Sequence, residues 1–479
     1  MPDSADLLSA RDASTAADLR ERFAFLPEIV ADMERKVPYA SAMMRSRSGL
    51  RLSLRDAEQT VERLDPQEGI VLTASNGYGL EEAATDETDA AAVRRLADAL
   101  VDRALAYRPP DGQPPLVIAN DGAVAGDFAT PMEQDPADMP LAYKVTRFDE
   151  LRRALRDKDQ RTVQAICQYN DQEVQQVFAQ RGGLSTQQIR RITLALIPFL
   201  SDGTRQEYSY LARTGTGGLE KIEMPDEALT RVSEEAAAML GAVPVPPGTY
   251  DVVTDTVTTG VIAHEAFGHG METDMFLKER ARAADYLGKR VGSDLVNIVD
   301  DPSMAGAYGS YFVDDEGREA GPTQIIRDGI LQGGLTDLYS ASRLGISRTA
   351  NGRRESVHRK AYARMSNTFF TPGSSTREEL LESLDDGVLL RQTLNGMEDP
   401  KGWGIQIWAL FAVEYKHGKP TGRIFSPVAI TGYVPDVLAD VSMVSDDFQL
   451  DGGTCGKGWK ELVPVTSGGP HLRTRCRLA

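Results

Sequence analysis

The segment "GWGIQIWALFAVEYKHGKPTGRIFSPVAITG", residues 402–432, decides the fold class of this sequence. Apolar side chains alternate from Trp403 to Val413, which is the period of a β-strand with one buried face. A polar turn over 417–422 then leads into a second extended run. The segment therefore predicts an antiparallel hairpin in the C-terminal part of the chain.

Elsewhere in the chain, the spacing of apolar residues indicates both helices and strands. Residues 89–107 place apolar side chains at helical spacing, whereas 160–212 contains short β-type runs. The segment "VPVPPG" at 243–248 is typical of a hinge between domains. We expect an α+β protein with an N-terminal mixed α/β domain over 1–245. A C-terminal domain over 246–479 would hold a large, mostly antiparallel β-sheet that carries a metal-binding helix.

Composition narrows the functional classes. The 479 residues are 41% hydrophobic, enough for several buried cores. The formal net charge of -18 disfavours binding to nucleic acid or to an anionic membrane. No segment resembles a signal peptide or a membrane span, and the three cysteines are too scattered for a disulfide framework. We therefore expect a cytoplasmic protein with no nucleic-acid or membrane partner.

The stretch "VIAHEAFGHGMETD", residues 261–274, concentrates metal-binding residue types. His264 and His269 are five residues apart, so about 140° separates them on a regular helix. They can share a metal only if the helix is distorted, for example by a π-turn, or ends between them. Gly268, directly before the second histidine, permits either change.

A catalytic zinc usually has three protein ligands, so two histidines leave one ligand to find. Glu272 and Asp274 lie close by in sequence, and Cys455 lies in the distant glycine-rich stretch 451–459. Spacing alone does not choose among them. Glu265, between the histidines, is suited to act as a general base. The alternative is a surface helix whose polar side chains are merely solvated.

Four motifs together resemble the TldD/PmbA family of metalloproteases, in both order and separation. They are "HEAFGHGMETD" at 264–274, "NGRRES" at 351–356, "RMSNTFFTPG" at 364–373 and "GGTCGKGWKELVPVTSGGP" at 452–470. The resemblance spans about 245–472, and the retained metal motif is that of the active, TldD-type subunit.

The resemblance implies a zinc peptidase with one Zn²⁺ per active subunit. The implied ligands are His264, His269 and Cys455. Glu265 would take a proton from the zinc-bound water that attacks the peptide carbonyl. Glu272 and Asp274 then become candidates for orienting the ring N–H groups of the histidines.

Substrates and partners also follow from the resemblance. We expect unfolded or extended peptides to enter an enclosed cavity in a dimer, either a homodimer or a heterodimer with a PmbA/TldE-like subunit. Asn351, Arg353 and Arg354 either bind a peptide carboxylate or form a turn held by a salt bridge. Two other functions share the zinc site: a peptide-binding scaffold with a structural zinc, and a zinc amidase of small molecules.

Overall fold

The first sheet is built from long antiparallel strands of the N-terminal half. The computed structural model describes residues 13–119, 122–458 and 460–479. The strand order is β3-β2-β1-β5-β6-β4, with β7 and β8 also paired to β6. The strands are β1 (Tyr39–Leu54), β2 (Gln59–Ser75), β3 (Leu80–Thr85), β4 (Gly126–Ala129), β5 (Thr162–Gln180), β6 (Gly183–Ser201), β7 (Gln206–Tyr208) and β8 (Leu211–Thr216).

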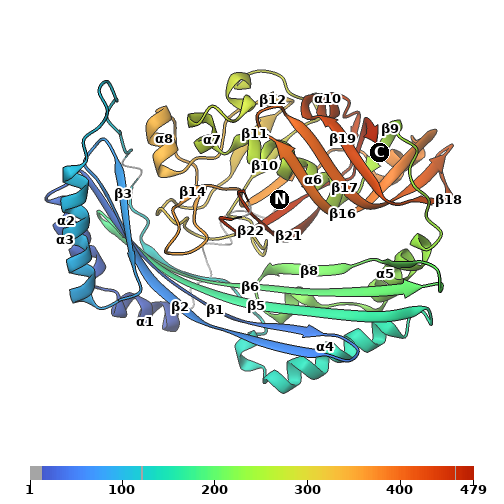
Figure 1. Cartoon of the computed structure of the whole chain (residues 1–479), viewed down its shortest axis with the longest axis horizontal. Helices are drawn as coiled ribbons and strands as arrows, with labels where there is room; N and C mark the ends of the chain where they lie inside the picture. Colours follow the sequence, from blue (N-terminus) through green and yellow to red (C-terminus); the bar gives the residue numbers. More distant parts are fainter. Residues whose placement is uncertain (1–12, 120–121, 459) are drawn as a thin grey trace.

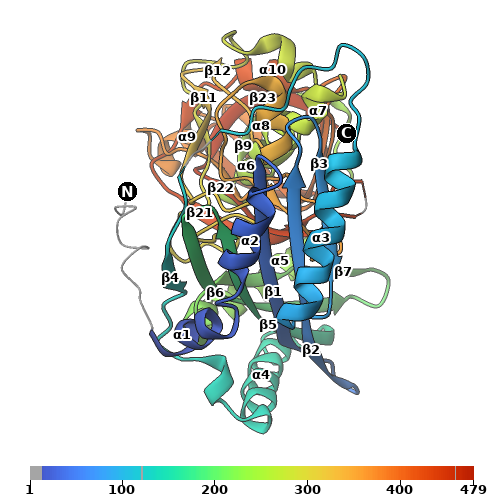
Figure 2. The same ribbon diagram turned by 90° about the vertical axis from the view of Figure 1, so that its left-hand side faces the viewer.

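Helices cover the outer face of this sheet. Apolar side chains at even positions of β1, such as Ala42 and Met44, pack against α2 (Leu26–Glu34) and α3 (Ala90–Ala106). Farther along the strands, α4 (Leu141–Arg156) and α5 (Asp226–Met239) cover β5 and β6. The opposite, concave face is turned toward the C-terminal half of the chain (Figure 1). A short helix, α1 (Ala13–Arg22), precedes α2 (Figure 2).

Two further sheets form the C-terminal half. One has the order β12-β11-β10-β15-β22-β21, and the other has the order β16-β9-β23-β19-β17-β18, closed into a ring by pairing of β16 with β17. The strands are β9 (Gly248–Thr254), β10 (Ile298–Asp300), β11 (Thr323–Arg327), β12 (Ile330–Leu331), β15 (Asn367–Phe370), β16 (Asp386–Asp399), β17 (Gly404–Lys416), β18 (Lys419–Phe425), β19 (Val428–Tyr433), β20 (Met443–Val444), β21 (Gln449–Cys455), β22 (Val463–Gly469) and β23 (Leu472–Leu478). A small pair, β13 (Gly352–Arg353) and β14 (Tyr362–Ala363), lies apart from both.

Helix α6 (Thr256–Phe267) lies between these two sheets, in contact with β15 and β22 on one side and β16 on the other. Gly260 permits this approach, because a Cβ there would overlap the backbone of Gly468. Asp255 caps the helix by accepting from Thr258 N at 2.9 Å. The remaining helices are short: α7 (Thr273–Leu277), α8 (Leu338–Leu344), α9 (Arg377–Glu382), α10 (Val434–Ala439) and the 3₁₀ turns η2 (Pro136–Asp138), η3 (Leu219–Ile222), η4 (His269–Met271) and η5 (Arg282–Tyr286).

The predicted α+β class is confirmed, with large antiparallel sheets, the helix expected at 89–107 and the hairpin expected at 402–432. The runs in 160–212 were expected to be short, but β5 and β6 are 19 residues each. The concave face of β5 and β6 carries polar side chains. The alternation of apolar and polar residues that marks a strand is therefore interrupted in the sequence, and each long strand looks like several short runs. In the described part of the chain, no helix combines the length and apolarity needed to cross a membrane. The boundary between 245 and 246 stays a prediction.

Candidate metal centre

The backbone changes course between the two histidines. Helix α6 ends at Phe267, Gly268 takes φ -93° and ψ -72°, and a 3₁₀ turn begins at His269. The departure from a regular helix that the five-residue spacing predicts is therefore observed, as a helix end rather than a π-turn. A Cβ on Gly268 would overlap Met365 Sδ and the carbonyl of His264, so only glycine fits this position.

This turn brings both imidazoles to one sulfur. Cys455 Sγ lies 3.2 Å from His264 Nε2 and 3.1 Å from His269 Nε2. The three donor atoms lie within 4.8 Å of one another, and the two rings stand nearly perpendicular, at 84°. Two imidazole nitrogens and one thiolate are a donor set that suits zinc. The geometry thus fits a single metal ion and leaves room for a further ligand.

The charges around Cys455 favour its thiolate form. Burial alone would raise the pKa of the thiol, but His264 and His269 outweigh burial and hold that pKa well below its usual range. Arg364 Nη2 lies 3.1 Å from the sulfur and adds a fixed positive charge. A metal ligand must be deprotonated, so this environment prepares the sulfur for binding.

Glu272 holds the second histidine from the other side. Its Oε2 lies 3.5 Å from His269 Nδ1, which leaves Nε2 directed at the sulfur. The carboxylate is buried, yet Lys457 at 2.9 Å and Arg364 at 3.0 Å overcome the effect of burial and lower its pKa. A carboxylate in this position fixes the tautomer and orientation of a ligating imidazole.

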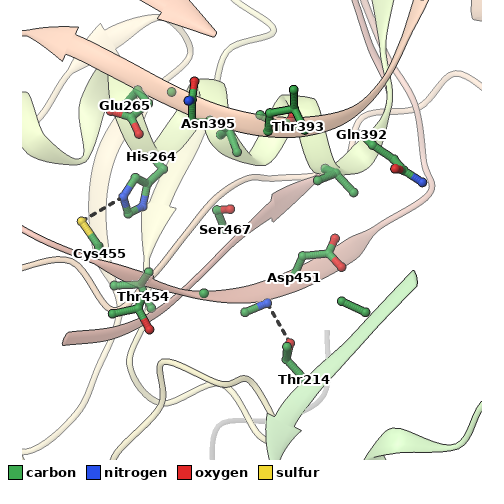
Figure 3. Close-up of a pocket in the computed structure, with 18 of the residues that line it drawn as sticks. Thr214, His264, Glu265, Gln392, Thr393, Asn395, Asp451, Thr454, Cys455 and Ser467 are labelled. Carbon is green, nitrogen blue, oxygen red and sulfur yellow. Dashed lines mark hydrogen bonds between the residues drawn. The ribbon is translucent and has the colours of Figure 1, made fainter. Parts of the chain in front are cut away.

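Glu265 lies on the next position of α6 and is half-buried. Its side chain packs against β16 at Gly396, where a Cβ would stand 2.5 Å from Glu265 Cγ. Figure 3 shows Glu265 beside Asn395 and above the ring of His264. No hydrogen bond or ion pair engages this carboxylate in the described residues, so its oxygens are free to accept a proton from a ligand.

A cavity of about 1390 Å³ contains His264, Glu265, His269 and Cys455 in its wall. Two strands run along it. Within the described residues, β21 is the last strand of its sheet, and β16 has no strand partner on one side beyond Leu390. The side chains of Asp255 and Tyr210 bond the β16 backbone at Gln392 and Thr393, and the edge is open farther along. Figure 3 shows these strands on either side of the opening, with Gln392 and Thr393 on one and Asp451 and Thr454 on the other. Segments of unpaired strand edge therefore border the candidate metal centre.

Comparison of the sequence with known proteins places the chain in a family. The sequence model of the PmbA/TldA metallopeptidase C-terminal domain matches residues 247–476. A protein of Methanothermobacter thermautotrophicus named metalloprotease is 34% identical over 343 residues, covering 71% of this chain and 74% of the relative. The chain belongs to the TldD/PmbA family.

Two further comparisons, one of sequence and one of structure, also point to TldD/PmbA proteins. A protein of Saccharolobus solfataricus named zinc metalloprotease TldD homolog is 29% identical over 273 residues, 56% of this chain and 60% of the relative. The crystal structure of TldE from Thermococcus kodakarensis superposes with a TM-score of 0.67 at 14% identity, covering 94% of this chain and 99% of that one. The second match shows the shared fold, and the first extends the family likeness to a named zinc enzyme.

Some residues singled out in the TldD/PmbA motifs lie away from the cavity wall. Asn351 is buried and donates to Asp300 Oδ2 at 2.8 Å and to the carbonyl of Arg364 at 3.0 Å. Asp274 pairs with Lys278 at 2.9 Å and with Lys457, not with a histidine. Asn351 thus supports the segment that carries Arg364, and Asp274 supports Lys457.

Arg353 and Arg354 point into a different pocket. Arg353 donates to the carbonyl of Met365 and stacks over Tyr311 at 5.0 Å, whereas Arg354 pairs with Glu82 at 2.7 Å. Both line a second cavity on the concave face of the first sheet. A salt bridge to a distant segment is therefore present at "NGRRES", and binding of a peptide carboxylate by these arginines stays a prediction.

Three polar residues at the site were not anticipated from sequence. Arg364 and Lys457 neutralise Glu272, and Glu398 lies in the cavity wall. Burial raises the pKa of Glu398 well above its usual range, and both of its oxygens lack a hydrogen-bond partner among the described residues. Arg364 and Lys457 do fall inside the quoted family motifs, which was the available signal, but Glu398 falls in none.

Proposed function

We propose that this chain is a zinc-dependent peptidase that hydrolyses peptide bonds of unfolded or extended peptides. The observation that carries the proposal is the convergence of His264, His269 and Cys455 beside Glu265 in the wall of one large cavity. These three residues would hold one Zn²⁺ in the cavity wall. A bound zinc ion supplies Lewis-acid polarisation of the scissile carbonyl.

The chain's own residues would handle the protons. Glu265 would take a proton from the attacking water and later give one to the departing amine, since its carboxylate faces the cavity and has no hydrogen-bond or ion-pair partner among the described residues. Glu272 would keep His269 oriented, while Arg364 would keep Cys455 as a thiolate.

The substrate class follows from the strand edges. An extended peptide can add to an unpaired strand through main-chain hydrogen bonds, which tolerate many sequences. Beyond Thr393, the edge of β16 has no strand partner on one side among the described residues, and it passes the side chain of Glu265 at Gly396. This edge supports a peptide lying there with its scissile bond near the metal ligands. A folded protein offers no such free segment, so the proposed substrates are unfolded.

The proposed assembly is a dimer, with a second copy of this chain or with a TldE-like subunit. The likeness of the whole chain to the TldE structure supports a partner of similar shape. Light scattering of the purified chain, alone and mixed with a motif-less homologue, distinguishes the two.

Substitution of Glu265 by Gln tests the mechanism, because it removes the base and keeps the size of the side chain. We expect kcat/KM for an unfolded protein to fall by about 100- to 10,000-fold, with about one zinc retained per chain. The matched control is Glu382→Gln, an exposed glutamate of α9. Retained cleavage in Glu265→Gln would overturn the proposed role, and unchanged activity is expected in the control.

A further inference from the structure

A second cavity, of about 240 Å³, lies between the concave face of the first sheet and the C-terminal half. Arginines dominate its wall, and we call it the arginine pocket. Its arginines are Arg45, Arg47, Arg51, Arg191, Arg353 and Arg354. In a chain with net charge -18, such a gathering of positive side chains in one enclosed space calls for a physical reason.

Strand register builds the floor of the arginine pocket. Arg45 and Arg47 occupy alternate positions of β1, so they share the concave face. Directly across on β5, they meet Gln176 and Val174. On the next strand, β6, Arg191 pairs with Gln172 of β5. A sheet face covered by another part of the protein is normally apolar, but this one is lined by guanidinium and amide groups.

Three of the six arginines are ion-paired. Arg45 pairs with Asp315, Arg354 pairs with Glu82 at 2.7 Å, and Arg51 lies 3.6 Å from Glu62. Besides Asp315, the pocket wall contains two other carboxylates, Asp314 and Glu355. Together with Glu82 and Glu62, which lie outside the wall, five carboxylates thus stand against the six arginines.

The other three arginines have no carboxylate within 4.0 Å in the described part of the chain. Arg191 donates only to the carbonyls of Tyr308 and Ser310, each at 2.8 Å, and Arg353 donates to a carbonyl and stacks on Tyr311. Arg47 contacts the neutral amide of Gln172. Burial, together with the neighbouring Arg353 and Arg45, lowers the pKa of Arg191 to about 9. An added anion would relieve this excess of buried positive charge.

The arginine pocket adjoins the metal-site cavity. Thr454 and Leu462 line both spaces, and Thr454 directly precedes the candidate ligand Cys455. A peptide whose scissile bond lies at the metal centre would therefore have part of its chain within reach of the arginines. Guanidinium groups bind carboxylates through paired, charge-assisted hydrogen bonds.

We propose that the arginine pocket binds a carboxylate of the peptide substrate, either its C-terminal carboxylate or an acidic side chain. The inference rests on the proposed peptidase function, and it assigns that enzyme a preference for acidic groups at one side of the scissile bond. Arg47, Arg191 and Arg353 are the principal partners, because none of them is ion-paired with a carboxylate of the described residues.

Binding of matched peptides to the zinc-loaded Glu265→Gln chain tests the proposal without cleavage. One fluorescent, otherwise neutral peptide is made as the free acid and as the C-terminal amide, and the amide is also made with Glu or Gln at each internal position. We expect one acidic peptide to bind at least about tenfold more tightly than its neutral match. The pair that shows the difference identifies which carboxylate is bound.

Arg47→Gln and Arg191→Gln, each added to that chain, should reduce this ratio to about one. Arg47 is partly exposed, so its variant remains informative if the buried Arg191→Gln fails to fold, as judged by circular dichroism. The matched control is Arg181→Gln at the turn of the same β5–β6 hairpin, where the side chain is 73% exposed and outside the pocket. The control should keep the preference.

Two results would overturn the proposal: no acidic peptide binds more tightly than its neutral match, or the ratio persists in Arg47→Gln. Competition by inorganic phosphate without any peptide preference counts as the first result. Cleavage assays with the wild-type chain keep the two hypotheses separate. Cleavage without an acidic preference would overturn the carboxylate-binding pocket and leave the peptidase activity standing. An acidic binding preference without cleavage would overturn the peptidase activity and leave the carboxylate-binding pocket standing.

Discussion

Cys455 Sγ lies 3.1 Å from His269 Nε2, although 186 residues separate them in the sequence. The contact joins the end of β21 to the turn after α6. Because no local segment contains all three donors, the metal can bind with full affinity only after both sheets have packed around the helix. Zinc is therefore expected to stabilise the native C-terminal half by an amount that grows with the logarithm of the ratio of zinc concentration to the dissociation constant.

Cys455→Ala should separate metal binding from folding. Removing one of three ligands is expected to weaken zinc binding by more than about 100-fold, beyond the loss typical of a supporting residue. Metal analysis after dialysis should then find far less than one zinc per chain. Cys167→Ala is the control, since Cys167 is a buried β5 residue whose pKa burial raises to about 12. Equal zinc content in the two variants would contradict the assigned ligand.

Gly396→Ala should impair catalysis and spare the metal. A methyl group there would stand 2.5 Å from Glu265 Cγ and would displace the carboxylate. A shift of about 1 Å in a catalytic group can cost about 100-fold, so we expect a loss of tenfold or more in kcat.

Gly404→Ala controls for the added methyl group in the same β16–β17 hairpin, because nothing lies within 4 Å of a Cβ there. Zinc content should be unchanged in both variants. If Gly396→Ala cleaves peptides as fast as Gly404→Ala, the placement of Glu265 against β16 has no catalytic consequence.

Glu316 predicts a loss of stability as the pH rises from about 4.5 to 8. Burial, aided by the nearby Asp337, raises the pKa of Glu316 to about 8, and its Oε2 accepts from Leu338 N. The folded state thus holds a proton that the unfolded state releases near pH 4.5. This contribution to stability is fully present below about pH 4.5 and is lost as the pH rises through 8.

Glu316→Gln keeps the acceptor and removes the titration. The free energy of unfolding of the wild type should fall relative to the variant between pH 5 and 9, by up to a few kcal/mol at about 1.4 kcal/mol per pKa unit. Urea melts at several pH values measure this difference. Parallel pH profiles for the two proteins would show that Glu316 does not carry the buried proton.

Sequence alone revealed the part of the site that is local. His264, Glu265 and His269 lie in one short stretch, and the helical period exposed their mismatch with a regular helix. Cys455 could be selected only by resemblance, because spacing within the chain says nothing about which strand end meets α6. Glu398 carried no signal, since its raised pKa arises from the burial of this β16 side chain in the folded protein.

The N-terminal half shows the same limit. Helix α3 was evident because its apolar face repeats with the helical period. The arginine pocket was not evident from the sequence. Arg47 and Arg191 lie on separate strands, which come together only through the strand order β1-β5-β6. Register across three strands depends on tertiary packing, which no single segment encodes.

The central claim is that one zinc at His264, His269 and Cys455 supports peptide hydrolysis. Titration of zinc into the metal-stripped chain, with simultaneous measurement of bound zinc and cleavage of an unfolded protein, tests it most directly. We predict no cleavage by the stripped chain and a rate that rises with bound zinc to a plateau at one ion per chain. Full cleavage by the stripped chain, or a rate that ignores the bound zinc, would contradict the claim.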